Sequence, residues 1–321
     1  MAIKKEKLSI EQLFARIIEK GIDADFRSRE EIDDLLERKR IKYEKLSDRE
    51  KKDFDMNQLK NPYSDSRILN ISEPSKIKKI LAGIDIGSGE LFLADKMGNV
   101  DLVIGHHPLG IALSNLSDVM HLQADVLHKY GVPINIAESL LVERITEVHR
   151  GISPINHNQT VDLAKALNIN LLCAHTPADN LAANYLEKKI KKGNIKYVDD
   201  ILSLLKSIPE YQFATKIGAG PKLFVGQGEN HTGKIVLSEI TGGTSGSPKM
   251  YEKMSQAGIG TIVGMHMSEE HRKEAEKSHI NVVVAGHISS DSLGMNLMLD
   301  EFEKSGIEVI ACSGLTRVKR F

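Results

Sequence analysis

Short apolar runs alternate with amphipathic stretches from Ile77 to the end of the chain. The runs have the length of single β-strands, and the apolar positions of the intervening stretches recur at helical spacing. This alternation is typical of βα units and predicts an α/β fold with mixed sheets covered by helices. The expected strands span residues 80–84, 102–104, 134–136, 171–174, 223–225, 235–237, 261–263, 282–285 and 309–311.

The stretches between these strands predict helices over residues 116–129, 138–149, 160–167, 181–192, 198–206, 251–256, 269–278 and 289–304. Between residues 209 and 250 the chain becomes glycine-rich and strand-like, which favours a hairpin or meander. We therefore expect two α/β halves, residues 77–208 and 209–321.

Three capping boxes in a row predict a helical extension over residues 1–60. Ser9, Ser28 and Ser47 are each followed three residues later by glutamine or glutamate, so each serine can cap the start of a helix. The dense charge of mixed sign is typical of a solvated helical face, and docking onto another subunit or a partner is the alternative. The polar segment 61–76 is expected to be a linker into the main body.

Composition and charge exclude several classes of protein. The net charge of the 321 residues is −1, so the basic field of nonspecific nucleic-acid binding is missing and nucleic acid is not favoured as a partner. No apolar stretch approaches the roughly 20 residues that cross a bilayer, and the charged start lacks the apolar core of a signal peptide. Cys173 and Cys312 lie in apolar runs, as reduced core thiols do. These features predict a cytoplasmic protein without a membrane partner.

Four apolar runs end at histidine, and this is the main chemical signal in the chain. The residues are the adjacent pair His106 and His107, then His175, His266 and His287. Ligands of open α/β sheets bind at the carboxyl ends of strands, so these imidazoles are expected to converge there. Asp179 and Asp291 each follow a strand-end histidine by four residues, which places carboxylate and imidazole toward the same crevice.

Histidines and carboxylates without thiolates suit Zn²⁺, Fe²⁺, Mn²⁺ or Co²⁺. Five or six such groups exceed what one catalytic ion with an open position requires, which indicates two ions and the chemistry of hydrolysis. A single histidine at a strand end is more often a hydrogen-bonded structural residue, and this alternative applies to His175 and His266. Asp85 is expected to be a helix cap rather than a partner of the site.

Two further features bear on catalysis. Glu138, Glu239 and His266 are candidates for a general acid or base by position only, and none is assigned. The glycine-rich stretch 241–248 could cradle a phosphate with backbone amides, although it fits no named phosphate-binding signature and a mobile turn is an equal alternative.

Three motifs, taken in order, resemble a known family. They are His106-His107-Pro108-Leu109, the segment from Ala174 through His175 to Asp179, and Ala285-Gly286-His287 followed by Asp291. The stretch from about residue 77 to 321 is similar to the Nif-three-like dinuclear metal-binding family, whose bacterial members often carry the name GTP cyclohydrolase I type 2. The resemblance implies two divalent ions per chain, held by His106, His107, Asp179, His287 and Asp291, with His175 beside them.

The resemblance also implies two α/β halves that share one metal site and assemble as homo-oligomers, often hexamers. It implies a dinuclear metal-dependent hydrolase acting on a small molecule such as a nucleotide, with opening of the guanine ring of GTP as the named reaction. The alternative is a non-catalytic metal-binding scaffold or regulatory adaptor. One departure concerns the site: the last acid is Asp291, where the family usually has glutamate.

Overall fold

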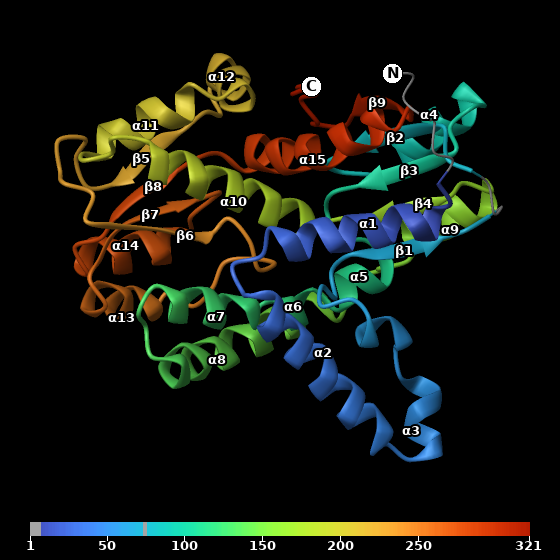
Figure 1. Ribbon diagram of the computed structural model, residues 1–321, viewed down its shortest axis with the longest axis horizontal. Helices are drawn as coiled ribbons and strands as arrows, with labels where there is room; N and C mark the ends of the chain where they lie inside the picture. Colours follow the sequence, from blue (N-terminus) through green and yellow to red (C-terminus); the bar gives the residue numbers. More distant parts are fainter. Residues whose placement is uncertain (1–7, 73–75) are drawn as a thin grey trace.

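The computed structural model describes residues 8–72 and 76–321 and contains two β-sheets flanked by helices (Figure 1). The first sheet has five strands in the order β1-β4-β3-β2-β9. Its parallel strands are β2 (Lys79–Gly83), β3 (Leu102–Gly105), β4 (Leu171–Cys173) and β9 (Glu308–Cys312). The edge strand β1 (Arg67–Asn70) runs antiparallel to β4. The α/β class expected from the sequence is confirmed.

The second sheet has four strands in the order β5-β8-β7-β6. Strands β6 (Lys234–Glu239), β7 (Ile259–Gly264) and β8 (Asn281–Val284) are parallel, and β5 (Lys222–Val225) runs antiparallel to β8. The carboxyl ends of β7 and β8 lead to His266 and His287, as those of β3 and β4 lead to His106, His107 and His175.

Two long helices join the halves. Helix α10 (Thr176–Lys192) follows β4, helix α15 (His287–Lys304) follows β8, and the two pack side by side along the middle of the molecule (Figure 1). At their crossing, a side chain at Gly294 would collide with the backbone of Ala178. Glycine at this position therefore allows the first turn of α10 to approach α15 closely.

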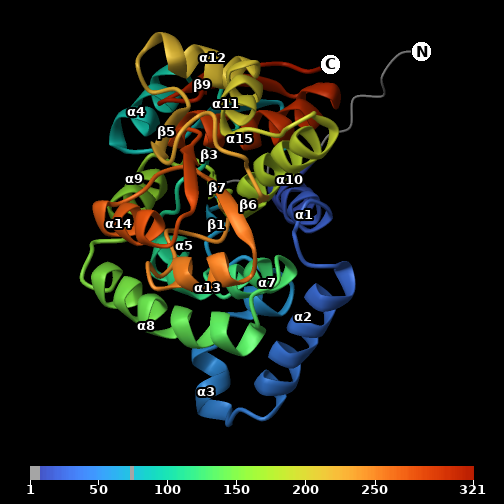
Figure 2. The same ribbon diagram turned by 90° about the vertical axis from the view of Figure 1, so that its left-hand side faces the viewer.

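The three expected N-terminal helices are α1 (Ile10–Asp23), α2 (Arg29–Glu44) and α3 (Asp48–Asp53), and all three capping boxes are present. Helix α1 buries its apolar face against α10 and is part of the core rather than a solvated extension. Helix α2 buries only Ile32, and α2 and α3 project from the body (Figures 1 and 2). A short turn of 3-10 helix (Met56–Leu59) leads back to β1.

The remaining helices cover the sheets and agree in most places with the expected ones. They are α4 (Ser88–Met97), α5 (Gly110–Ser114), α6 (Leu116–Val119), α7 (Leu122–Lys129), α8 (Ile134–Ile152), α9 (Gln159–Ala166), α11 (Val198–Lys206), α12 (Pro209–Lys216), α13 (Met250–Gln256) and α14 (Glu269–Lys277). None of the helices in the described residues is long and apolar enough to cross a membrane.

Three local predictions were wrong. The run 134–136 is the first turn of α8, because Pro133 precedes it and the amphipathic pattern continues to Ile152. The region 209–250 holds α12 and strands at opposite edges of the second sheet instead of a hairpin. The segment 61–76, expected to be a linker, contributes β1 to the first sheet, and its residues 61–67 are buried; residues 73–75 lie outside the described part.

The two sheets do not divide the chain into consecutive halves. Strand β9 returns to the first sheet although it belongs to the stretch 209–321. Helices α7 and α8, from the stretch 77–208, pack in one apolar cluster with strands of the second sheet. This exchange makes one core out of both parts and fixes the relative position of the loops at the strand ends.

Candidate metal centre

The five expected metal ligands come from three strand ends and meet at one place. His106 and His107 directly follow β3. Asp179 lies in the first turn of α10, while His287 and Asp291 lie in the first two turns of α15. Groups far apart in the chain converge because both helices start at strand ends and cross beside Gly294.

The distances define two sets of groups with one shared member. The Nε2 atom of His106 lies 3.4 Å from Oδ1 of Asp179 and 3.5 Å from Oδ1 of Asp291. The other oxygen of Asp291, Oδ2, lies 3.5 Å from Nε2 of His107 and 3.7 Å from Nε2 of His287. Each set could hold a metal ion, and Asp291 contributes one carboxylate oxygen to each.

These spacings fit divalent cations. Bonds of 2.0–2.2 Å in a tetrahedral site place the ligand atoms about 3.3–3.6 Å apart. Three of the four distances lie in this range, and the 3.7 Å between His287 and Asp291 is slightly longer. Among the described residues, Nε2 of His106, Oδ1 of Asp179 and both oxygens of Asp291 are buried and have no hydrogen-bond partner. Buried polar atoms without partners are costly, and a cation between them would remove that cost.

The second ring nitrogen of three histidines is held by an oxygen atom. Nδ1 of His106 lies 3.1 Å from the carbonyl oxygen of Ala174, and Nδ1 of His107 lies 2.6 Å from Oδ1 of Asp85. Nδ1 of His175 lies 2.8 Å from Oδ2 of Asp65. A proton on Nδ1 leaves Nε2 free to face the centre, which is the usual arrangement for metal-ligating histidines.

Two of these outer groups differ from the sequence-based expectation. Asp85 contacts His107 and does not cap α4, whose N-cap is Gly87. Asp65 lies in the segment taken for a linker, is fully buried, and also accepts a hydrogen bond from Thr176 at 2.6 Å. The polar composition around Asp65 gave no sign of this role, since its partner is more than a hundred residues away in the chain.

His175 lies beside the candidate ligands and could itself be one of them. Its Nε2 atom lies 3.8 Å from Oδ2 of Asp179, and it forms a third possible metal-binding group with His106 and His107. His266 lies behind His287, with ring centroids 5.1 Å apart, and its Nδ1 lies 3.1 Å from the hydroxyl of Ser245.

Burial and the histidines set the charge states of the acids. Burial alone would raise the pKa of Asp291, but His106, His107 and His287 outweigh it and hold that pKa well below the usual range. Burial raises the pKa of Asp179 to about 8, against the opposing effect of His175. A divalent cation would favour the ionised form of both carboxylates.

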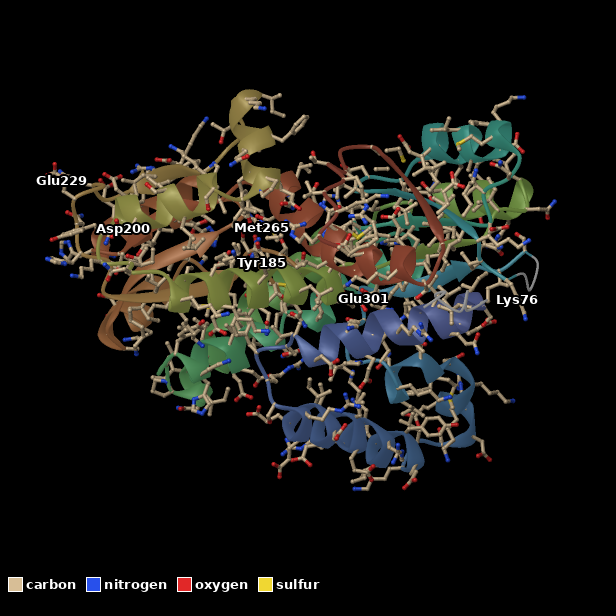
Figure 3. The ribbon with its side chains drawn as sticks, turned by 45° about the horizontal axis from the view of Figure 1, so that its top comes forward. Lys76, Tyr185, Asp200, Glu229, Met265 and Glu301 are labelled. Carbon is tan, nitrogen blue, oxygen red and sulfur yellow. The ribbon has the colours of Figure 1, made fainter. Side chains whose placement is uncertain are left out.

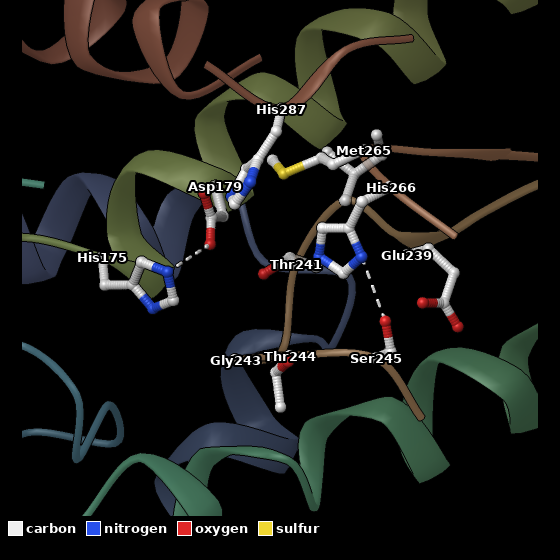
Figure 4. Close-up of a pocket in the computed structure, with 11 residues that line it drawn as sticks. His175, Asp179, Glu239, Thr241, Gly243, Thr244, Ser245, Met265, His266 and His287 are labelled. Carbon is white, nitrogen blue, oxygen red and sulfur yellow. Dashed lines mark hydrogen bonds and ion pairs between the residues drawn. The ribbon is translucent and has the colours of Figure 1, made fainter. Parts of the chain in front are cut away.

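A cavity of about 20 Å³ adjoins the ligands, enough for one water-sized group (Figure 4). His175, Asp179 and His287 lie on one side of it and the glycine-rich stretch from Thr241 to Ser245 on the other. Glu239 and His266 also line the cavity, whereas Glu138 lines a different cleft beside α2. Met265, which also lines the cavity, lies near the middle of the molecule, whereas Glu229 marks one end of the molecule (Figure 3). The cavity is therefore central in the molecule.

The centre opens to solvent beside two of its histidines. The side chain of His287 is 42% exposed and that of His107 is 26% exposed, whereas His106 and Asp291 are fully buried. Asp85, which holds His107, is 68% exposed. A small molecule can therefore approach from the side of His107 and His287.

Comparison with known proteins finds similar solved structures. No family model matches the sequence, and no curated protein matches it. A NIF3 superfamily protein from Sphaerobacter thermophilus has 29% sequence identity and a TM-score of 0.71, and the match covers 78% of this chain and 92% of that protein. The chain resembles the NIF3 superfamily in fold and sequence, which supports a NIF3-like family for it.

Other solved structures match the NIF3-like chain more weakly. Reduced HcgD from Methanocaldococcus jannaschii is 16% identical with a TM-score of 0.45, over 74% of this chain and 84% of that protein. A Bacillus cereus protein related to NIF3 is 12% identical with a TM-score of 0.41, over 80% and 93%. The Nif-three-like resemblance read from the three motifs is confirmed, and the fold with its groups of histidine and aspartate fits a metal-binding protein.

Proposed function

We propose that this NIF3-like protein is a hydrolase that uses two divalent metal ions. The observation that carries the proposal is the position of Asp291, whose two buried oxygens face two different sets of ligands. His107, His287 and Asp291 would hold one ion, and His106, Asp179 and Asp291 the other. Two such ions lower the pKa of water and polarise a substrate oxygen.

The chain's own residues would orient the ligands and move protons. Asp85 and the carbonyl oxygen of Ala174 fix the rings of His107 and His106, so that their Nε2 atoms point to the centre. Glu239 and His266 line the cavity across from Asp179 and are the residues best placed to exchange a proton with a bound molecule. Burial raises the pKa of Glu239, although His271 and His266 oppose this effect.

The cavity limits the kinds of substrate that can reach the centre. Its volume of about 20 Å³ has room for one water-sized group, so the triphosphate of a nucleotide would have to be held outside. The reacting group is therefore a small one that reaches the centre past His107 and His287. GTP, with ring opening and release of formate, is the first compound to test, followed by smaller amides and phosphoesters.

Elemental analysis of the purified protein and formate release from GTP test the proposal together. We expect two ions per chain, and hydrolysis of at least one compound of the panel that is abolished in His106→Ala. The exposed His149 on α8 offers a matched control, because His149→Ala should change neither metal content nor turnover. Hydrolysis that persists in His106→Ala would show that the metal centre does not take part in the reaction.

A non-catalytic scaffold is the second candidate, and the projecting helices α2 and α3 favour it. They leave Ile41 exposed and bury little against the body. A scaffold predicts metal binding without hydrolysis of any compound in the panel. Deleting residues 1–60 cannot test it, since α1 belongs to the core. Assembly as a homo-oligomer, with a hexamer as the expected form, is compatible with both candidates and is measured by light scattering.

A further inference from the structure

The glycine-rich segment 241–246 is held from its outer side through its carbonyl groups. Gln123 on α7 donates from Nε2 to the carbonyl oxygens of Gly242, at 2.7 Å, and Thr244, at 2.5 Å. Nε of Arg144 on α8 donates to the carbonyl oxygen of Ser245 at 3.1 Å. Three carbonyl groups of the segment therefore point toward α7 and α8, away from the cavity.

The direction of the carbonyls fixes the direction of the next N–H groups. In a planar trans peptide, the C=O of one residue and the N–H of the following residue point in opposite directions, and the described chain has no cis peptide. The N–H groups of Gly243 and Ser245 thus point away from Gln123. Both residues line the cavity beside the metal ligands (Figure 4).

The third peptide of the segment agrees with this geometry. The carbonyl of Ser245 faces Arg144, so the N–H of Gly246 should point inward. The N–H of Gly246 does interact with the carboxylate of Glu239, a residue of the cavity wall, and lowers its pKa against the larger effect of burial. Glu239 also lines a second cavity together with Gln123, so the cavity side of the segment follows from Gly243 and Ser245, which line the cavity beside Asp179.

The two inward N–H groups have no acceptor among the residues that the structure describes. The cavity between them and the ligands has room for one oxygen-sized group. On its far side, Oδ1 of Asp179 is buried and without a partner. Donors without acceptors on one wall and cation ligands on the other are suited to a negatively charged oxygen atom between them.

We propose that the N–H groups of Gly243 and Ser245 form an oxyanion-binding pair that holds a substrate oxygen opposite the metal ligands, with Gln123 as the positioning residue. The inference rests on the proposed function and names the substrate class more closely. The oxygen belongs either to a phosphate group or to a carbonyl group that gains negative charge when water adds to its carbon. Arginine and lysine are not needed in the cavity, because backbone donors and metal ions supply the positive potential.

Binding of two oxyanion probes to the zinc-loaded, full-length protein tests the pair. Inorganic phosphate represents a phosphate group, and methylboronic acid, which forms a tetrahedral anion, represents water addition to a carbonyl carbon. Gln123→Met removes the donor at nearly constant volume, and Gln123→Glu keeps the shape but replaces the donating nitrogen with oxygen. Gln212→Met is the matched control, since Gln212 also donates to a backbone carbonyl but lies exposed on α12.

We expect the dissociation constant of at least one probe, measured by calorimetry, to rise about tenfold or more in both Gln123 variants and to stay unchanged in Gln212→Met. Zinc content and the thermal midpoint identify a variant that fails to fold. Weaker binding of phosphate alone would indicate that the substrate carries a phosphate group at this position. Weaker binding of the boronic acid would indicate a substrate with a reacting carbonyl group. Equal affinities in wild type and both Gln123 variants, or no binding of either probe to the wild type, overturn the proposal.

A second readout reports on the N–H groups directly. In zinc-loaded protein labelled with ¹⁵N-glycine, the resonance of Gly243 should move downfield when the effective probe is added, and this shift should be absent in Gln123→Glu. A Gly243 resonance that ignores the probe contradicts the pair. Failure of the proposed function looks different: a scaffold would show no turnover of any compound, yet the probe affinities would still depend on Gln123.

Discussion

At the scale of single residues, the most consequential side chain is Asp291. Where the family usually has glutamate, the shorter aspartate still reaches both sets of ligands, because α15 begins at His287 and enters the centre with its first two turns. Its two oxygens lie 3.5 Å from His106 and from His107. One methylene less therefore does not separate the carboxylate from either set.

The shared position of Asp291 predicts unequal effects of two similar substitutions. Asp291→Asn should lower the affinity for both ions by more than the 10–100-fold typical for outer groups of a metal site. The reason is that the amide replaces one carboxylate oxygen by nitrogen and removes the negative charge shared by the two sets. Asp179→Asn should weaken only the ion held with His106. Elemental analysis after dialysis measures the difference. Loss of one ion in both variants would show that Asp291 does not bridge.

Asp85 gives a milder prediction, because it contacts a ligand and not the centre. Asp85→Ala removes the 2.6 Å contact to Nδ1 of His107, so the ring loses its fixed orientation. We expect metal affinity to fall about 10- to 100-fold with the fold unchanged. Asp95→Ala, which removes an exposed acid of α4, is the control. Titration with a competing chelator measures the affinities, and equal values for both variants would contradict the role of Asp85.

At the scale of elements, strand ends and helix starts build the centre. The convergence of the candidate ligands was predictable because apolar runs mark strands and the carboxyl ends of parallel strands meet at one edge. Asp65 and Gln123 were not predictable. Strand β1 has only four residues, and Gln123 acts on a segment 119 residues further along the chain. Local patterns contain no information about such distant partners.

The wrong elements have the same cause. An isoleucine, a polar residue and another isoleucine at 134–136 fit a strand as well as the first turn of a helix, so short runs stay ambiguous. Tertiary packing favours the helix here, because α8 packs with α7 against the second sheet. The long helices, with several turns of consistent spacing, were predicted over most of their length, although the first residues of α8, α10 and α15 were missed.

The crossing of α10 and α15 predicts that Gly294 controls the metal centre from a distance. A methyl group in Gly294→Ala would collide with the carbonyl oxygen of Ala178, next to Asp179, and force the helices apart. We expect a loss of about 1–3 kcal/mol in the free energy of unfolding, together with weaker metal binding. Gly151 on α8 has open space around it, so Gly151→Ala should be neutral or slightly stabilising. Urea denaturation and elemental analysis measure both effects, and a Gly294→Ala variant as stable as Gly151→Ala would contradict the close crossing.

At the scale of the whole molecule, the C-terminal tail ties the two sheets together. The tail leaves β9 in the first sheet and crosses α15, where Arg317 pairs with Asp300 at 2.5 Å and with Glu303. It ends beside α12, the helix that leads into the second sheet, where Arg320 pairs with the fully buried Glu210 at 2.6 Å. The tail thus adds a second connection to the one made by α10 and α15.

Breaking the last of these pairs should destabilise the molecule without touching the metal centre. Arg320→Met leaves the carboxylate of Glu210 with Asn296 as its remaining hydrogen-bond partner in the described chain. An unpaired buried charge typically costs about 3–5 kcal/mol, and we expect the lower part of that range because Arg320 is 20% exposed. Adding Glu210→Gln removes the charge and should recover part of the loss.

Urea denaturation measures the free energy of unfolding of the single and double variants, and the metal content of both should equal that of the wild type. A single variant as stable as the wild type would mean that the tail does not join the two sheets, whereas a double variant no better than the single one would place the loss in packing rather than in the buried charge.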